Sequence, residues 1–171
     1  MVLIRERRYN HIKVADIIAR ADVGRSTFYD HFKSKDDILL HSMAGLYAVL
    51  AQVIAKDANI AQLTGLLEHF WQNRHMARDM MFEPASALGP KHGTRHLTEL
   101  IESRLQTLCR ERKIKPTVPL TVAAAQTAEG LMAALRVWLM GKVSCTPALL
   151  AKALHASASA SVEAFVQAAR R

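Results

Sequence analysis

Apolar residues recur along most of the chain at the three- and four-residue spacing of an α-helix. The first clear run has its apolar side chains on one face and ends at the sequence ADVG; its members are Val14, Ile17, Ile18 and Ala21. A second, shorter run has two phenylalanines four residues apart, Phe28 and Phe32. This spacing predicts a helix over residues 25–32 with both rings buried. The two runs and the short break between them predict a helix-turn-helix.

The break itself carries residues suited to a tight turn. Asp22 stands where the chain must reverse, and aspartate tolerates the left-handed conformation better than most residues do. Val23 is expected to plug the turn, and Gly24 is an acceptable N-cap for the second helix. A third helix is expected to begin after the cap residue Ser34, because two aspartates in its first turn suit the helix dipole.

The rest of the chain keeps the helical spacing. The third helix is expected to run to about residue 56, and Pro and Gly then mark three breaks at EPASALGPKHG, KIKPTVP and GKVSCTP. Composition agrees, since the chain has only 7 Gly and 5 Pro in 171 residues. Residues 1–9 are interpreted as the tail of a helix. Further helices are expected over 59–73, 74–83, 93–113, 118–141 and 147–170, which makes the predicted fold all-α.

Composition and charge argue against a secreted or membrane-spanning protein. The chain has a net charge of +8, but residues 1–45 hold eight Lys and Arg against six Asp and Glu, so charge alone is weak evidence for nucleic acid. Cys109 and Cys145 are isolated, as in a reducing compartment. The N-terminus turns charged after four residues, and polar side chains interrupt the most apolar stretch, 118–140. We therefore expect a cytoplasmic protein without a signal peptide, a membrane span or a membrane partner.

Motifs for catalysis and metal binding are not evident. The sequence has no nucleophile elbow, Gly-rich phosphate loop or HExxH motif, so neither an enzyme nor a cofactor is predicted. His92 and His96 are four residues apart and could in principle hold a metal ion on one helix face. With no cysteine nearby and Gly93 between them, a solvated pair is the favoured interpretation, and no metal site is predicted.

The second helix of the predicted helix-turn-helix combines buried aromatics with an outward polar face. The side chains expected to face outward near its N-terminus are Arg25, Ser26, Thr27 and His31. This end of a recognition helix is the part that meets base edges in the major groove. Arginine suits bidentate contact with guanine, and threonine can meet thymine or a phosphate. The hydroxyl of Tyr29 and the ammonium of Lys35 could each meet a backbone phosphate. The alternative is an ordinary solvated face.

The stretch HIKVADIIARADVGRSTFYDHFKSKDDILL resembles the DNA-binding domain of TetR-type transcriptional regulators. The hallmark of that family is a turn of the form Ala-Gly-Val-Ser, followed by Thr-hydrophobic-Tyr-x-His-Phe and then by Lys-Glu-x-Leu. The resemblance covers Ile12 to Leu40, and it implies a homodimer that binds a palindromic operator and is released by a small-molecule effector. It also implies DNA contacts, which carry over to Lys13, Arg25, Ser26, Thr27, Tyr29, His31 and Lys35.

The sequence departs from the family pattern in three places. Asp22 replaces the usual turn glycine. Lys13 replaces the usual capping threonine, so Asp16 is expected to lose its capping-box partner. The family's first helix also normally begins about ten residues earlier. An alternative function is therefore a helical small-molecule-binding or scaffold protein whose shortened first helix has abolished DNA binding.

The larger part of the chain has the character of a second domain. We expect a DNA-binding domain over residues 1–45 and a helical effector-binding and dimerisation domain over residues 46–171. Small residues in the last two predicted helices let helices approach closely. The resemblance implies that this pair forms a four-helix bundle with its copy in a dimer, and an intramolecular hairpin would use the same pattern.

The segment EHFWQNRHMARDMMFEPASALG concentrates aromatic residues and methionines with a few polar groups. Such a mixture suits an adaptable apolar pocket, although it equally suits an ordinary core. The candidate effector-binding residues are Trp71, His75, Phe82, Arg104, Gln126 and Glu129.

Overall fold

The computed structural model describes residues 9–82, 90–116 and 118–168, and the described residues form helices without any strand. This confirms the predicted all-α fold. The predicted helical tail at residues 1–9 lies almost entirely outside the described residues, and a short 3-10 helix follows it. In chain order the elements are η1 (Tyr9–His11), α2 (Val14–Ala21), α3 (Arg25–His31), α4 (Lys35–Ala51), η2 (Gln52–Ile54), α5 (Ile60–Gln72), α6 (Arg74–Phe82), α7 (Pro90–Glu111), α8 (Leu120–Leu139) and α9 (Pro147–Ala168).

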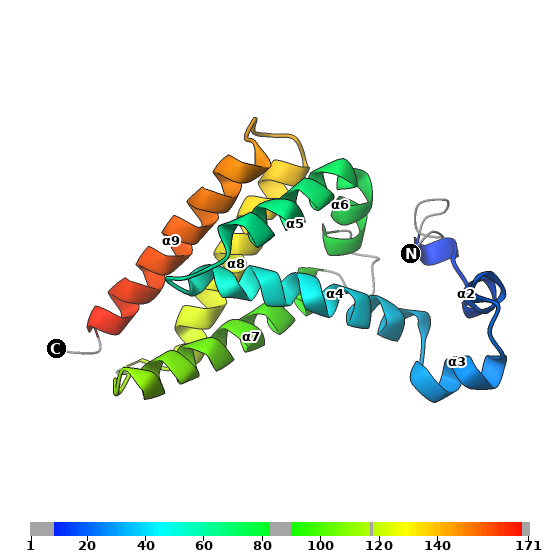
Figure 1. Ribbon diagram of the computed structural model, residues 1–171, viewed down its shortest axis with the longest axis horizontal. Coiled ribbons are helices and arrows are strands. Elements are labelled where there is room, and N and C mark those ends of the chain that lie inside the picture. Colours follow the sequence, from blue (N-terminus) through cyan, green and yellow to red (C-terminus); the bar gives the residue numbers. More distant parts are fainter. Residues whose placement is uncertain (1–8, 83–89, 117, 169–171) are drawn as a thin grey trace.

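Two short helices stand at one end of an otherwise bundled molecule. Figure 1 shows α2 and α3 at the right, beside the beginning of α4, and helices α5 to α9 around the rest of α4. Helix α4 runs without a break across the boundary expected at residue 45, from the short helices into the bundle. Helix α4 therefore belongs to both predicted domains.

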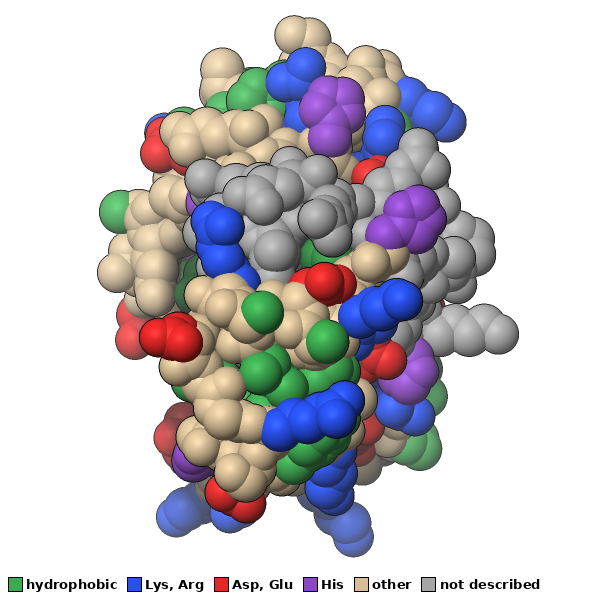
Figure 2. All heavy atoms as spheres, turned by 90° about the vertical axis from the view of Figure 1, so that its right-hand side faces the viewer, with side chains coloured by type: hydrophobic (Ala, Val, Ile, Leu, Met, Phe, Trp, Pro, Cys, Tyr) green, Lys and Arg blue, Asp and Glu red, His purple; other side chains and the backbone are tan. Residues whose placement is uncertain are grey.

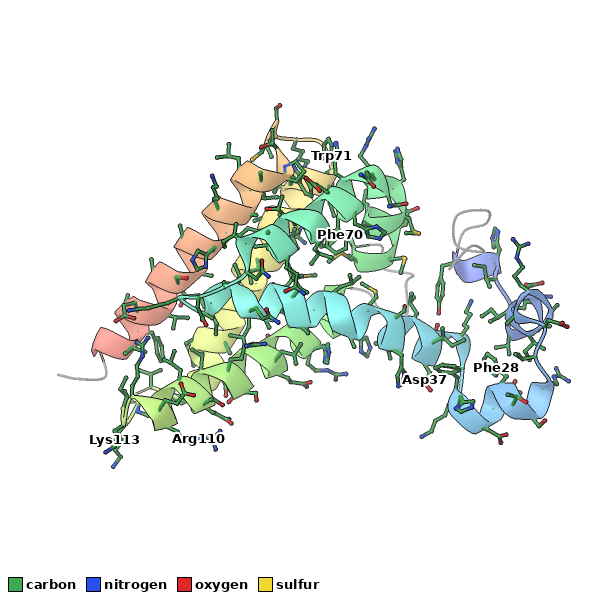
Figure 3. The ribbon with its side chains drawn as sticks, in the orientation of Figure 1. Phe28, Asp37, Phe70, Trp71, Arg110 and Lys113 are labelled. Atoms are coloured by element: carbon green, nitrogen blue, oxygen red, sulfur yellow. The ribbon has the colours of Figure 1, made fainter. Side chains whose placement is uncertain are left out.

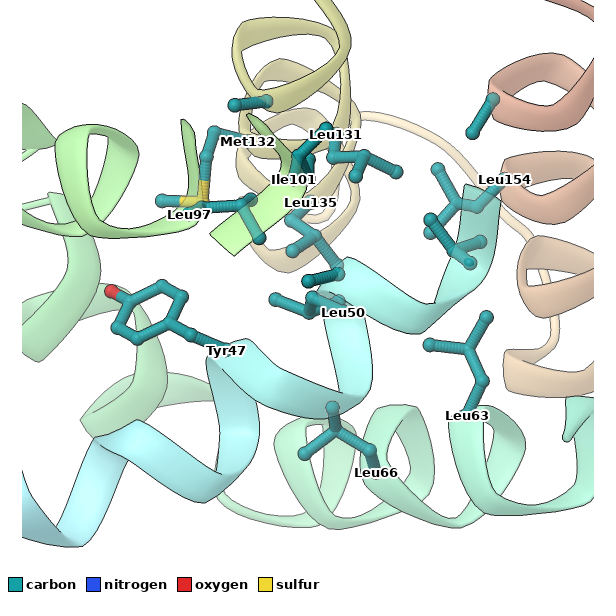
Figure 4. Close-up of a cluster of buried hydrophobic side chains, with 14 of the residues drawn as sticks. Tyr47, Leu50, Leu63, Leu66, Leu97, Ile101, Leu131, Met132, Leu135 and Leu154 are labelled. Carbon is teal, nitrogen blue, oxygen red and sulfur yellow. The ribbon is translucent and has the colours of Figure 1, made fainter. Parts of the chain in front are cut away.

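A single apolar core holds the bundle together. Leu50 of α4, Ile101 of α7 and Leu135 of α8 have no exposed surface, and Figure 4 shows them meeting at the centre of the cluster. Trp138 is also fully buried, and its indole nitrogen donates a hydrogen bond to the carbonyl of Cys145 (2.9 Å). Burial of each such side chain stabilises the fold by about 1.5–3 kcal/mol. The core therefore fixes α4 firmly against α7 and α8.

One stretch, Lys35–Ile54, is long and apolar enough to cross a membrane when judged by length and composition alone. It comprises α4 and η2. A core helix of a globular protein passes the same test, and Leu39, Met43 and Leu50 are buried here against other helices. Its apolar character is thus accounted for by the core.

The helix bounds follow the sequence prediction with small differences. The third predicted helix was expected to reach residue 56, whereas α4 ends at Ala51 and one 3-10 turn follows. Helix α7 begins at Pro90 rather than at residue 93. Proline is accepted in the first turn of a helix because its missing N–H has no partner there, so the break at this point is shorter than the sequence suggested.

Candidate nucleic-acid interface

The turn between α2 and α3 has the geometry expected of a helix-turn-helix. Asp22 adopts the left-handed conformation (φ 52°, ψ 46°), as predicted, and closes α2 with a hydrogen bond from its N–H to the carbonyl of Ile18. The N–H of Val23 donates to the same carbonyl at 3.3 Å. The expectation that Val23 plugs the turn is wrong, because its side chain is 39% exposed. Backbone hydrogen bonds, rather than a buried side chain, hold this turn.

Helix α2 begins with half of a capping box. Lys13 is the N-cap residue, and its backbone N–H donates to the carboxylate of Asp16 at 2.8 Å. The expectation that Asp16 would lose its capping partner is therefore wrong, since its partner is a backbone group that any residue supplies. The other half of the box is missing, because an ammonium group has no acceptor for the N–H at the third helical position. The side chain of Lys13 lies exposed on this face.

An aromatic cluster fixes α3. Phe28 is 4% exposed and packs edge-on against Tyr29, with ring centroids 5.2 Å apart. Phe32 follows α3 as an extended C-cap residue and is only half-buried, so the predicted burial of both rings holds fully for Phe28 alone. The ring of Phe32 meets His41 of α4 edge-on at 5.7 Å. Figure 3 shows Phe28 on the side of α3 that faces α2 and α4, so the opposite side of α3 faces away from the protein.

The free side of α3 carries the predicted base-reading and phosphate-binding residues together. Gly24 caps the helix, as predicted, with an extended backbone (φ −69°, ψ 152°). All five outward residues are exposed: Arg25, Ser26, Thr27, Tyr29 and His31. The aromatic ring of Tyr29 packs on Phe28 while the residue remains 53% exposed. The helix therefore presents a polar surface on an apolar anchor.

Lys35 has contacts that the sequence prediction did not foresee. Its ammonium donates to the backbone carbonyls of Tyr9 (3.1 Å) and Ile12 (3.0 Å), and it lies 4.6 Å from the centre of the Tyr9 ring. The side chain is half-buried, with two of its three N–H donors occupied. Lys35 thus fastens the segment before α2 to the start of α4. Its contact with a DNA phosphate stays a prediction.

The neighbouring Asp36 makes a further contact between the segment before α2 and the start of α4. It accepts a hydrogen bond from the hydroxyl of Tyr9. Burial and, secondly, this carboxylate raise the pKa of Tyr9 far above its usual range, so the hydroxyl stays protonated as a donor. The sequence did not predict this pair because Tyr9 and Asp36 are 27 residues apart in the chain, and Tyr9 lies outside the stretch that resembles the family.

The junction of α3 and α4 is closely hydrogen-bonded. The hydroxyl of Ser34 accepts from the N–H of Asp37 at 3.1 Å, which confirms the predicted cap. The Asp37 carboxylate in turn accepts from the N–H of Lys33 at 3.0 Å. The position of α3 is therefore coupled to the first turn of α4.

The face that carries the helix-turn-helix has a mixed charge. Figure 2 shows Lys and Arg side chains spread over this side of the molecule, with Asp and Glu side chains among them. The surface is thus not a uniform cationic patch. Any recognition of a polyanion by this face depends on the arrangement of particular residues, rather than on bulk charge.

The predicted effector residues in α5 and α6 belong partly to the core. Trp71 stacks on the buried Trp138 with ring centroids 4.9 Å apart, and the guanidinium of Arg74 lies 5.4 Å from the centre of the Trp71 ring. Phe82 is buried in the same core, whereas His75 is exposed. These positions match the core interpretation of this segment better than a ligand pocket.

The remaining effector candidates lie elsewhere. Arg104 lines a hollow of about 400 Å³ together with Lys56 and Arg112. Gln126 and Glu129 are exposed on α8. The structure therefore does not bring the six candidates into one site, and their role in effector binding stays a prediction.

The two histidines of α7 have protein partners. Arg95 donates to Nδ1 of His92 at 3.2 Å, and the ring of His96 meets Tyr47 edge-on at 5.7 Å. Among the described residues, no three His, Cys, Asp or Glu side chains converge to hold a metal ion. His96 instead lies near the carboxylate of Glu99 (3.9 Å).

Comparison with known proteins identifies the N-terminal domain. Residues 1–42 match the model of a family described as bacterial regulatory proteins of the tetR family. No curated protein matches the chain. The matched residues include α2, the turn at Asp22 and α3, with its buried Phe28 and exposed polar face. Residues 1–42 therefore match the helix-turn-helix DNA-binding domain of the tetR family of bacterial regulatory proteins.

Proposed function

We propose that the protein is a cytoplasmic, ligand-responsive repressor that binds palindromic operator DNA as a homodimer and is released by a small-molecule effector. The observation that carries this proposal is the free polar side of α3. Its five outward residues are exposed together, on a helix that Phe28 anchors to the domain.

The contacts proposed for α3 follow from the chemistry of its side chains. Arg25 would read a guanine through two hydrogen bonds, with Ser26 and Thr27 beside it at the same end of the helix. Tyr29 and His31 would contact backbone phosphates and set the depth of the helix in the major groove. Lys13, exposed at the start of α2, would meet a neighbouring phosphate, and Lys35 would do so through its one remaining donor.

Exposed residues on the last two helices support the proposed homodimer. Two stripes with the same spacing run along these helices, exposed at every position except the half-buried Ala133: Val122, Gln126, Glu129, Ala133 and Val137 on α8, and Leu149, Ala153, Ala156, Ala160 and Ala164 on α9. Leu149 is 59% exposed and Val122 is 52% exposed, which is costly in water unless a partner covers them. The small residues between them would allow the helices of a second copy to approach closely.

A two-fold dimer would set the spacing of the operator. The two copies of α3 would enter successive major grooves, roughly 34–36 Å apart or somewhat more. Helix α4 would relay effector binding, because it runs without a break from Lys35, just after α3, into the core of the bundle. A shift of α4 would then change the separation of the two recognition helices.

A binding selection tests this function directly. The purified protein is mixed with random-sequence duplex DNA at moderate salt, and the bound fraction is separated by gel shift, amplified and reselected. We expect enrichment of an inverted repeat, with affinity that falls as salt rises, because binding to phosphates releases counterions. Failure to enrich any sequence would favour the alternative, a helical small-molecule-binding or scaffold protein that does not bind DNA.

A further inference from the structure

A groove of about 310 Å³ lies between the first half of α4 and the beginning of α7. This volume is within the range of small-molecule sites. Its walls come from α4, which contributes Asp37, His41 and Tyr47, and from α7, which contributes His92, Gly93 and Arg95. None of the six predicted effector residues lines it, so it is a separate candidate.

The groove contains a buried hydroxyl that has no hydrogen-bond partner. Tyr47 is 2% exposed, and its Oη makes no hydrogen bond among the described residues. Leaving such a group unpaired costs about 1–3 kcal/mol, whereas phenylalanine would fill the same space without this cost. Figure 4 shows the ring of Tyr47 extending from α4 at the edge of the core cluster. The hydroxyl thus lacks a partner within the described part of the chain, and a partner from outside would reach it when the start of α7, which covers it at Gly93, moves aside.

The packing around Tyr47 is adapted to its hydroxyl. A Cβ atom placed on Gly93 would lie 2.3 Å from Oη and 3.1 Å from Cζ of Tyr47. Any larger residue at position 93 would thus displace the ring. Gly93 allows α7 to begin directly over the hydroxyl.

The walls of the groove favour a flat aromatic molecule. Besides Tyr47, three imidazole rings and the exposed side chain of Leu40 line it. The charged groups of the wall each contact a histidine: Asp37 lies 3.4 Å from His41, Arg95 donates to His92, and Glu99 lies 3.9 Å from His96. The groove therefore has aromatic surfaces, and the hydroxyl of Tyr47 is the buried polar group of its wall that has no partner among the residues that the structure describes.

We propose that this groove is the effector site, and that it takes a planar aromatic molecule whose oxygen atom hydrogen-bonds to the Tyr47 hydroxyl. The proposal rests on the proposed function, since it names the site through which DNA binding is regulated. It replaces the region around Trp71 as the place where an effector acts.

Contacts on the groove wall connect this site to the recognition helix. His41 lines the groove and also meets the ring of Phe32, the residue that directly follows α3. Asp37 lines the groove and accepts from the N–H of Lys33. A molecule in the groove therefore touches two of the side chains that set the direction of α3 relative to α4.

The test uses the full chain without DNA, so that a failure of DNA binding does not affect the result. Binding of acetophenone and of α-methylstyrene, in which a methylene group replaces the carbonyl oxygen, is measured by NMR titration and thermal shift. We expect the parent to bind acetophenone at least tenfold more tightly, and Tyr47→Phe to abolish this difference. The Tyr47→Phe protein without a ligand should unfold at the same or a higher temperature than the parent, which separates loss of binding from loss of folding.

The control variant is Thr107→Val, which removes a hydroxyl from the other hollow. It should keep the parent's preference for acetophenone. The proposal is overturned if neither probe binds at millimolar concentration, if both bind the parent equally, or if Tyr47→Phe retains the preference. Gly93→Ala gives a further check, because its lowered unfolding temperature should recover in part when combined with Tyr47→Phe.

Discussion

Asp22 shows how one residue can hold a turn at an energetic cost. Its left-handed backbone (φ 52°) closes α2, but a side chain with a Cβ atom is strained in this region. Glycine adopts the same conformation without strain. The chain thus retains the turn geometry of a helix-turn-helix with a residue that is not the best one for it.

We expect Asp22→Gly to raise the free energy of unfolding by about 0.5–1 kcal/mol, because strain is relieved at a position already left-handed. This change in the free energy of unfolding is measured by urea denaturation monitored by circular dichroism. Asp30→Gly is the matched control: position 30 is helical, so the same substitution should destabilise slightly, by about 0.3 kcal/mol. A loss of stability in Asp22→Gly would show that the aspartate side chain contributes more than its strain costs.

Lys35 stabilises the fold through its hydrogen bonds to two backbone carbonyls. We expect Lys35→Met to lower the free energy of unfolding by about 1–2 kcal/mol, since the carbonyls of Tyr9 and Ile12 lose their donor while the apolar stem is kept. The control is Lys33→Met, two residues away and exposed, which should change stability little. Equal stability of Lys35→Met and the parent would leave a phosphate contact as the sole role of this lysine.

Tyr47 makes stability depend on pH in the alkaline range. Burial raises its pKa to about 12 from the ordinary value of 10.0, so the unfolded chain loses this proton at lower pH than the folded chain does. Stability should therefore fall as pH rises from about 10 to about 12, by up to about 2–3 kcal/mol from this residue. Urea midpoints measured across this range should fall less steeply in Tyr47→Phe. An unchanged slope in that variant would contradict the burial of the hydroxyl.

At the scale of the elements, periodicity and capping residues were sufficient to predict the helices. The third helix begins after Ser34, as its cap predicts, and Gly24 caps α3. Errors occurred where a boundary depends on local tolerance, as at Pro90. Periodicity also cannot say how deeply a face is buried: Val23 and Phe32 were both expected to be more buried than they are.

Side-chain contacts between distant elements could not be predicted from one sequence. The Tyr9–Asp36 hydrogen bond and the close approach of Gly93 to Tyr47 join segments far apart in the chain, and no spacing rule connects them. The six predicted effector residues do not meet in one site, because a single sequence does not show which distant segments pack together. Aromatic and methionine-rich segments occur in cores and in pockets alike, and Trp71 here packs against Trp138 in the core.

The outward stripe of α9 gives a prediction for an element. We expect Leu149→Glu to shift the protein from dimer to monomer, weakening self-association at least tenfold, because a charge would be buried in the proposed interface. Sedimentation equilibrium over a range of concentrations measures the change. Ala148→Glu adds the same charge on the same turn but outside the stripe, and should leave the dimer intact. A parent protein that is monomeric at all concentrations would refute the proposed interface.

At the scale of the whole molecule, α4 is the element that joins recognition to the core. Its first turn holds the end of α3 through Asp37 and His41, while its last turns are buried among α5, α7 and α8. Few contacts link α2 or α3 to the bundle by any other route. Signals between a ligand in the bundle and DNA on α3 would therefore pass through this helix.

The outward side of α3 is the feature on which the proposed function depends, and position-resolved selection tests it most directly. The DNA sequences enriched by the parent and by Arg25→Ala from the same random pool are compared base by base. We expect the parent to enrich an inverted repeat, and Arg25→Ala to lose about 1–3 kcal/mol of preference at one base pair in each half-site while keeping the others. An unenriched pool, or identical preferences for the two proteins, would contradict the assignment of this helix face to DNA.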